Sequence, residues 1–272
     1  MFDFTYHRPA TLANASTQLA NAEHKPLAGG MSLIPSLKFR LNRHAALVDL
    51  GAIAELRGIR REGDTLVVGA TTPHAEVAGS TLVRQALPAL SVLAEGIGDP
   101  LVRNRGTIGG SIAHADPAAD YPSAVLGLNA TVVTQQRSIA AEDFFKGVFE
   151  TALQPGEIIT AVRFPCGPLT QRAGYAKYRQ PASRFALVGV FVVQTAAGVR
   201  VAVTGAAPSV FRFTAAEAAL NKRFDPSALE GVTLDANGLN SDIHASAVYR
   251  AHAVVEMAKR AVAAALGQGG SN

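Results

Sequence analysis

Cysteine, tryptophan and strong charge are scarce in this chain of 272 residues. The single cysteine, Cys166, excludes an internal disulfide, a four-cysteine zinc site and an iron–sulfur cluster held by this chain alone. Tryptophan is absent, aromatic residues make up only 6% of the chain, and the net charge is a mild +4 from scattered basic residues. A nucleic-acid-binding surface requires a denser basic stripe, so we expect no nucleic acid as a partner.

Long apolar runs are also missing. No stretch reaches the roughly 20 residues that a membrane-spanning helix needs, and the N-terminus lacks the basic and apolar segments of a secretory signal. Hydrophobic residues nevertheless make up 48% of the sequence and charged residues 17%, which is typical of a globular protein. We therefore expect a cytoplasmic protein without a transmembrane segment, built as one large domain or two modest ones.

The apolar spacing predicts a mixed α+β fold that divides near residue 167. Residues 58–69 are expected to form a hairpin around a Glu-Gly-Asp turn. Asp116 and Pro117 are typical of a helix start, which predicts a helix as far as about residue 126. In the first part we further predict helices at residues 11–22, 33–41 and 82–94, and strands at residues 46–50, 130–134 and 158–164.

The second part shows a different pattern. Val199, Val201 and Val203 alternate with polar or small residues, which predicts a half-buried antiparallel strand beside another at residues 187–194. Thr214 and Glu217 have the spacing of a capping box that opens a helix. A long amphipathic helix is predicted at residues 243–266. We therefore predict an antiparallel sheet with helices after the boundary.

Two glycine-rich segments indicate a binding function. Paired glycines permit positive φ and close backbone approach, and successive N–H groups can converge on an anion. Two such segments could grip a pyrophosphate from two sides, although a pair of tight turns would look the same. Neither segment has the spacing of a dinucleotide-binding fingerprint or a Walker A loop, which argues against the usual modes of binding nicotinamide nucleotides and ATP. The segments are Ala28, Gly29, Gly30, Met31 and Ser32, and Thr107, Ile108, Gly109, Gly110 and Ser111.

A few polar residues lie close in sequence to these segments or open the second part. Asp120 could accept hydrogen bonds from ligand hydroxyls, whereas Asp116 is read most simply as a helix cap. His114 and Asp116 alone make a poor metal site, and we predict neither a metal site nor a catalytic residue. Tyr175 and Lys177 fall on one face of a strand together with Arg179. That face is either exposed to solvent or turned toward a planar, electron-accepting ring.

Longer stretches of the sequence resemble a known family. PLAGGMSLIPSLKFRL and, some 75 residues later, RNRGTIGGSIAHADPAADYPSAVLGLNA are similar to the FAD-binding medium subunits of molybdenum hydroxylases of the carbon monoxide dehydrogenase and xanthine dehydrogenase type. The likeness continues through FFKGVFETALQPGEIITAVRFP and YAKYRQPASRFALVGV. It implies an FAD-binding domain of the vanillyl-alcohol oxidase type, made of two α+β subdomains, over residues 1–167. A smaller C-terminal α+β domain would follow over residues 168–272.

The resemblance also implies individual contacts to FAD. The two glycine segments, with Leu33 added to the first, match the backbones that hold the pyrophosphate. Asp120 matches an acidic position beside the ribityl chain, and Ile159 an apolar position against the cofactor. Lys177 matches a lysine near the isoalloxazine ring, with Tyr175 at the ring's edge. Met31 departs from the family's frequent Gln or His, and Arg105 is unusual before the second segment.

The resemblance finally implies a place in an electron-transfer complex. Substrate would be oxidised at a molybdopterin centre in a large subunit. Electrons would pass through two [2Fe–2S] clusters in a small subunit to FAD in this chain, and from there to an external acceptor. The assembly expected from the family is a dimer of heterotrimers. Two alternatives stay open: a stand-alone flavin oxidase or reductase of the same fold, and a scaffold that has lost FAD.

Overall fold

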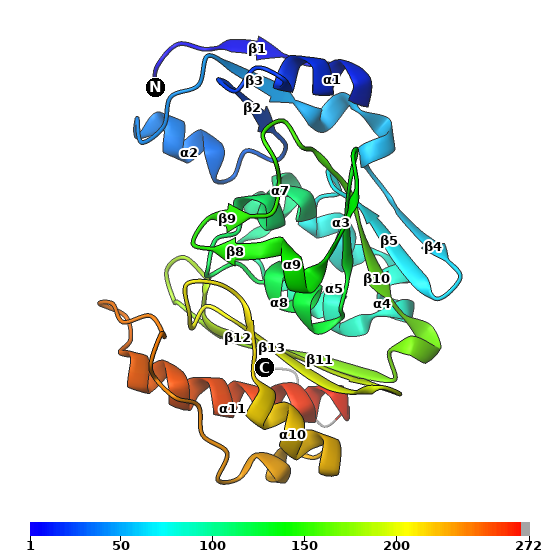
Figure 1. Cartoon of the computed structure of the whole chain (residues 1–272), viewed down its shortest axis with the longest axis vertical. Coiled ribbons are helices and arrows are strands. Elements are labelled where there is room, and N and C mark those ends of the chain that lie inside the picture. The colour runs from blue at the N-terminus through cyan, green and yellow to red at the C-terminus, as the bar shows by residue number, and fades with distance from the viewer. Residues whose placement is uncertain (268–272) are drawn as a thin grey trace.

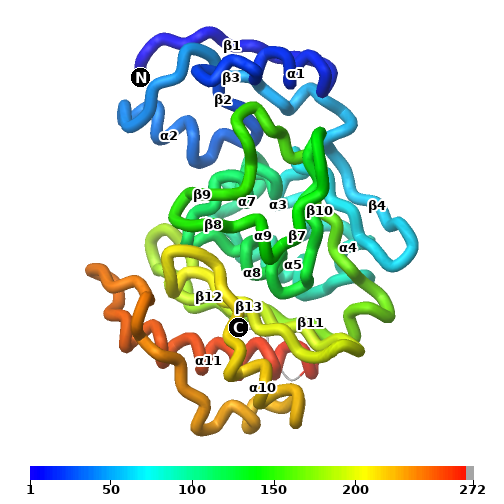
Figure 2. Tube along the Cα trace, viewed as in Figure 1, coloured from blue at the N-terminus to red at the C-terminus, as the bar shows by residue number. Residues whose placement is uncertain are grey.

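The computed structural model describes residues 1–267, and its chain runs through three stacked units (Figures 1 and 2). The first unit is a small parallel sheet of order β1-β3-β2 with two helices. Apolar residues of α1 and of the turns after β3 pack with Ile158 to form its own core. Its elements are β1 (Thr5–His7), α1 (Leu12–Leu19), β2 (His24–Leu27), α2 (Leu33–Lys38) and β3 (Ala46–Asp49), followed by two 3-10 turns, Leu50–Ala52 and Ala54–Leu56.

The second unit is an antiparallel sheet of order β4-β5-β10-β6-β7 with short helices packed against it. β4 and β5 confirm the predicted hairpin, and β10 confirms the predicted strand near residue 160. The strands are β4 (Ile59–Glu62), β5 (Thr65–Gly69), β6 (Thr131–Thr134), β7 (Ser138–Ala140) and β10 (Ile159–Pro165), with a separate hairpin of β8 (Phe145–Gly147) and β9 (Glu150–Thr151). The helices are α3 (His74–Gly79), α4 (Thr81–Ala86), α5 (Pro88–Glu95), α6 (Pro100–Arg105), α7 (Ile108–His114), α8 (Tyr121–Gly127) and α9 (Ala141–Phe144).

The third unit is an antiparallel sheet of order β11-β12-β13-β14, which lies between the second unit and the long helix α11 (Figure 1). The valines that alternate along β12 and β13 fill the core beneath α11, as the period-two pattern predicts. This unit holds β11 (Arg172–Arg179), β12 (Ala186–Thr195), β13 (Gly198–Thr204), β14 (Phe211–Arg212), α10 (Thr214–Lys222), α11 (Ala247–Ala265) and 3-10 turns at Gly167–Leu169 and Pro226–Leu229.

Several local predictions need correction. Residues 82–94 form two helices, because Pro88 cannot donate a backbone hydrogen bond and holds Leu87 in a non-helical conformation. Residues 96–110, for which the sequence analysis predicts no helix, contain α6 and the start of α7. The helix predicted from Asp116 begins instead at Tyr121, since the Asp116 carboxylate closes a turn with the Ala118 N–H.

The prediction that Thr214 and Glu217 form a capping box at the start of a helix is also wrong. α10 is preceded by Phe213 and has no side-chain cap, because Glu217 accepts hydrogen bonds from Arg212 and from the Val201 backbone instead. The long helix is shorter than predicted and begins after Ser246, whose hydroxyl caps the Tyr249 N–H. The start of α10 thus depends on a tertiary contact that no local spacing reveals.

Candidate functional site

The first glycine segment joins the end of β2 to the start of α2 and presents unused backbone donors. Gly30 adopts φ +73°, a conformation that favours glycine. The carbonyl of Gly30 accepts from Ile34, which starts the helix. Within the described part of the chain, the backbone N–H groups of residues 29–33 donate to no protein acceptor. Free donors in a row are what the predicted binding of an anion by this segment requires.

The second glycine segment differs from the expectation. It is the first turn of α7, capped by Thr107, whose hydroxyl accepts from the Gly110 N–H at 3.1 Å. The N–H groups of Ile108 and Gly109 donate to the carbonyls of residues 72 and 70 at 3.2 and 2.8 Å. Neither Gly109 nor Gly110 has positive φ. The N–H groups of residues 108–111 thus have protein acceptors, and the predicted role of this segment toward an anion stays a prediction.

The two segments, more than 70 residues apart in sequence, lie in contact. A Cβ added at Gly29 would stand 2.1 Å from the carbonyl oxygen of Arg105. A Cβ added at Gly110 would stand 3.8 Å from that of Ala28. Glycine at position 29 is therefore required by packing of backbone on backbone. The close approach places the free donors of residues 29–33 beside the start of α7, where the first and second units meet (Figure 1).

The remaining side chains named for the two segments differ in exposure. Met31 and Ser32 are exposed, and Leu33 and Ser111 are half-buried. Ile159 is buried in the main core at the start of β10, next to a bulge in its pairing with β6. Ile159 thus lies on the strand that packs under α7.

Asp120, Tyr175 and Lys177 form one buried cluster that joins the second and third units. Lys177 Nζ lies 2.8 Å from one carboxylate oxygen of Asp120 and donates to the Gly96 carbonyl at 2.9 Å. The Tyr175 hydroxyl donates to the same carboxylate. Burial raises the pKa of Asp120, while the Lys177 ammonium opposes that rise. The two residues predicted to share a strand face therefore do so, but Arg179 lies beyond a bulge and is exposed.

Sequence reasoning missed the segment that supports α7 from behind. His74 donates its backbone N–H to the Gly106 carbonyl at 2.9 Å, next to the two carbonyls that hold Ile108 and Gly109. Its imidazole is buried against Gly106 and the ring of Tyr121, and burial lowers the pKa of His74 to about 4. His74 Nδ1 and the Tyr121 hydroxyl are buried without a partner among the described residues. A buried histidine after Thr-Thr-Pro carries no distinctive sequence signal.

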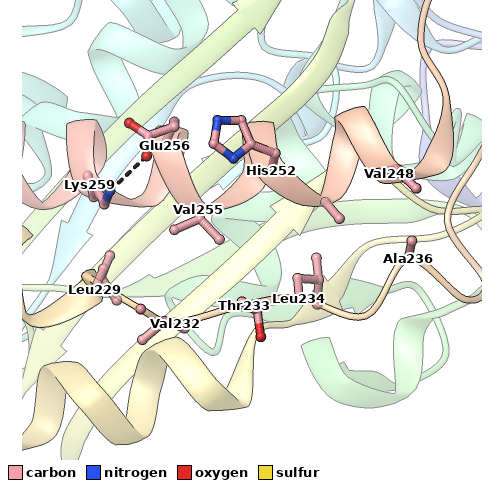
Figure 3. Close-up of a pocket in the computed structure, with 12 residues that line it drawn as sticks. Leu229, Val232, Thr233, Leu234, Ala236, Val248, His252, Val255, Glu256 and Lys259 are labelled. Atoms are coloured by element: carbon pink, nitrogen blue, oxygen red, sulfur yellow. Dashed lines mark hydrogen bonds and ion pairs between the residues drawn. The ribbon is translucent and has the colours of Figure 1, made fainter.

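Other features of the described chain lie outside this site. A cavity of about 370 Å³ lies on the outer side of α11, lined by an apolar floor with His252, Glu256 and Lys259 at its rim (Figure 3). Residues 1–267 contain no group of side chains that could hold a metal ion. No helix in that range is long and apolar enough to cross a membrane. Cys166 is buried, and burial raises its pKa.

Comparison with known proteins assigns the chain to a family. Residues 2–167 match the family model described as the FAD binding domain in molybdopterin dehydrogenase. The chain belongs to the FAD-binding medium subunits of molybdopterin dehydrogenases. This medium subunit is 34% identical to the carbon monoxide dehydrogenase medium chain of Hydrogenophaga pseudoflava, with 96% of each chain covered. It is 35% identical to the nicotine 6-hydroxylase medium subunit of Paenarthrobacter nicotinovorans, with 94% and 95% covered.

Solved structures support the same conclusion for the fold. A chain of quinoline 2-oxidoreductase from Pseudomonas putida 86 superposes with a TM-score of 0.89 at 31% identity, covering 98% of each chain. The predicted fold class, an FAD-binding domain followed by an antiparallel sheet with helices, is confirmed. The medium subunit is thus an oxidoreductase flavoprotein subunit of the carbon monoxide dehydrogenase and xanthine dehydrogenase type.

The site residues of this medium subunit fit FAD. A pyrophosphate needs several convergent donors and a backbone without side chains in the way. Residues 29–33 offer such donors, and a Cβ at Gly29 would occupy the space where the two segments meet. Gly30 supplies the positive φ that turns the chain there.

Proposed function

We propose that this chain holds FAD as the electron-transfer subunit of a molybdenum hydroxylase. Electrons would arrive from [2Fe–2S] clusters of a small partner subunit and leave to an external acceptor, while a large partner subunit would carry molybdopterin. FAD supplies the redox chemistry when bound, and the protein supplies binding, orientation and electrostatics. The observation that carries the proposal is the run of free N–H groups at residues 29–33 against the start of α7.

The proposal assigns a role to each named residue. Residues 28–33 would bind the pyrophosphate through their backbone, and residues 107–111 would form the opposing wall. Ile159 would pack beneath the cofactor. We further propose that residues 1–167 form the FAD-binding domain and residues 168–272 the C-terminal domain, although residues 268–272 lie outside the described residues.

Lys177 is proposed to lie near the isoalloxazine ring, with Asp120 beside the ribityl chain and Tyr175 at the ring's edge. Because Lys177 is paired with Asp120 at 2.8 Å, its positive charge is largely compensated. The electrostatic effect on a neighbouring ring would then come from the pair as a unit. Replacing either partner alone would shift the flavin potential, and in opposite directions.

The names of the relatives support a multisubunit setting, since those proteins are called medium chain and medium subunit. By family resemblance, we propose a dimer of heterotrimers with a large molybdopterin subunit and a small iron–sulfur subunit. Co-expression of the three chains followed by mass measurement of the purified complex tests this assembly. A chain that purifies alone from such cells would contradict it.

The function is tested by expressing the chain alone and adding FAD. We expect a flavin spectrum at one FAD per chain and no turnover of purines, aldehydes or N-heterocycles without the partner subunits. Turnover by the isolated chain would favour a stand-alone flavin oxidase. Absence of bound flavin would favour a scaffold that has lost FAD.

A further inference from the structure

A second cavity of the described chain, of about 470 Å³, lies between the short helices of the second unit. It is bordered by α3, by the end of α5, and by α4 and α6. Its charged residues are Arg84, Arg103 and Glu95, so two cations face one anion. The volume falls in the range of small-molecule sites. The lining is completed by small residues, Ala75, Ala78 and Gly79.

Both arginines of this cavity are anchored by backbone carbonyls at the end of a neighbouring helix. Arg84 donates from Nε and Nη2 to the carbonyls of residues 78–79, at 3.3 and 3.0 Å, where α3 ends. Arg103 donates from Nη1 to the carbonyls of residues 97–98, at 3.1 and 3.2 Å, just after α5. Cations are favoured at helix C-termini, so this anchoring needs no carboxylate.

Each guanidinium keeps one edge for a further acceptor. A guanidinium carries several N–H donors in a planar fork. The contacts of Arg103 all leave from Nη1, so its Nε–Nη2 edge donates to no described residue. Those of Arg84 leave from Nε and Nη2, so the N–H groups of Nη1 donate to none. Among residues 1–267 neither arginine forms an ion pair, although Glu95 lines the same cavity.

We propose that this cavity binds the diphosphate group of a phosphorylated small molecule. Two guanidinium edges offer more N–H groups than the two oxygens of one carboxylate can accept, whereas a diphosphate presents oxygens on both phosphates. The volume of about 470 Å³ leaves room for the group that the diphosphate carries. The inference does not rest on the proposed function, because the pyrophosphate of FAD is assigned to residues 28–33.

The cavity borders the cluster of Lys177 and Asp120 across one short segment. Lys177 donates to the carbonyl of Gly96, and Arg103 donates to the two carbonyls that follow it in the chain. Burial and the charge of Arg103 also lower the pKa of His74, which supports α7. A diphosphate in the cavity would therefore place its negative charge one segment away from Lys177.

The test titrates inorganic pyrophosphate and ADP into the FAD-loaded chain and measures binding by calorimetry, while FAD occupies the first glycine segment. For Arg84→Gln we expect pyrophosphate affinity to fall about tenfold, the scale of one lost hydrogen bond between charged groups. Glu95→Gln removes the one carboxylate among the lining residues and should raise the affinity about threefold. ADP that binds more tightly than pyrophosphate assigns the site to nucleotides, and equal affinity assigns it to the diphosphate alone.

Two further variants separate a specific site from a general attraction. Arg61→Gln is the matched control, since Arg61 is also exposed and donates to a backbone carbonyl, that of Gly63 at 2.9 Å, outside the cavity. It should bind pyrophosphate as the wild type does. Arg84→Lys keeps the charge but loses the planar fork, so its affinity should lie between those of the wild type and Arg84→Gln.

The outcomes for the cavity and for the proposed function are distinguishable. A wild-type chain that binds no pyrophosphate, or an affinity that Arg84→Gln and Glu95→Gln leave unchanged, overturns this inference alone. An equal fall in Arg61→Gln also overturns it, because the attraction would then come from the overall charge. A chain that takes up no FAD overturns the proposed function, and the same titration of the flavin-free variants still tests the cavity.

Discussion

Residues 28–32 and 107–111 each contain a glycine pair and end in serine, yet their backbones behave differently. In the first segment the N–H groups are free, Gly30 turns the chain with positive φ, and Met31 and Ser32 are exposed. In the second, Gly109 and Gly110 belong to a helix, and the N–H groups of residues 108–111 donate to Thr107 or to residues 70 and 72. Both pairs let protein segments pack closely, at Gly29 and at Gly109, but only the first pair also leaves donors free for a ligand.

The difference between the two segments shows that a glycine pair in a sequence does not by itself identify a ligand site. It indicates that something approaches the backbone closely, but the approaching group can be a ligand or the protein itself. At Gly109 an added Cβ would stand 2.7 Å from the Ala70 carbonyl oxygen, so the protein is the approaching group. The second segment is held from behind by residues 70–74, and α8, which follows α7 in the chain, begins at the cluster of Asp120 with Lys177. Substitutions that disturb these supports, and then the glycines themselves, test the contrast.

The largest effect is expected from Lys177→Met. The substitution leaves the carboxylate of Asp120 buried without its cation, a situation that typically costs about 3–5 kcal/mol of the free energy of unfolding. Since burial already raises the pKa of Asp120, the carboxyl group should take up a proton more readily in the variant. Urea unfolding at pH 7 measures the loss, and the loss should shrink as the pH is lowered.

The double variant Asp120→Asn/Lys177→Met is the control for that loss. It removes both charges, so most of the lost stability should return. A double variant as unstable as Lys177→Met would show that the pair matters for its packing and not for its charge. The second unit would then be joined to the third at this cluster by side-chain packing alone.

A smaller effect is expected from the protonation of His74 beneath α7. Burial lowers the pKa of His74 to about 4, whereas the unfolded chain binds the same proton near pH 6.5. The unfolded state therefore gains protons first, and stability should fall as the pH drops from about 6.5 to about 4, by up to about 3 kcal/mol. His74→Gln should remove this part of the pH dependence.

Unfolding by urea at several pH values between 7 and 4 measures the pH dependence of stability that is attributed to His74. His252→Gln serves as the control, because His252 is exposed on α11, far in sequence from the site. The part of the pH dependence that His74→Gln loses should be kept in His252→Gln. A wild-type curve that His74→Gln leaves unchanged would mean that His74 does not support α7 through its neutral ring.

Gly30→Val tests the first segment directly. A β-branched residue at φ +73° should cost about 1–2 kcal/mol of stability, and its Cβ would stand 3.0 Å from Ile34. FAD content should fall to near zero, because the turn that presents the free donors changes. Gly238→Val is the matched control, since Gly238 also has positive φ (+80°) but has open space around it. It should lose similar stability and keep its FAD.

Much of the fold follows from local patterns, and the errors of prediction have physical causes. The strands of β12 and β13 and the β4–β5 hairpin follow from period two and turn chemistry, which are properties of neighbouring residues. The false helix start at Asp116 arose because an aspartate before proline is equally suited to a turn. The carbonyls of residues 117–119 accept hydrogen bonds from Thr204, Gly205 and Ala186, which keep that segment out of a helix.

The candidate site was less predictable. Strand alternation places Tyr175 and Lys177 on one face, but only the tertiary fold brings Asp120 between them. The free donors of residues 29–33 agree with the expected role of the first segment. The support by His74 depends on contacts between distant segments, which no spacing in the sequence reveals. The roles of these residues toward FAD stay predictions.

Gly110→Ala should have the smallest effect. It tests whether the second segment contributes less than the first to the binding of FAD. Gly110 is helical, so alanine gains about 1 kcal/mol of helix propensity. The new Cβ would stand 2.9 Å from the Thr107 hydroxyl oxygen and weaken that cap, which costs about 1 kcal/mol. The melting temperature should therefore barely change, and FAD should remain bound with an affinity reduced far less than in Gly30→Val. If Gly110→Ala instead loses FAD as completely as Gly30→Val, the second segment contacts the phosphates as closely as the first, and the two glycine pairs share one role.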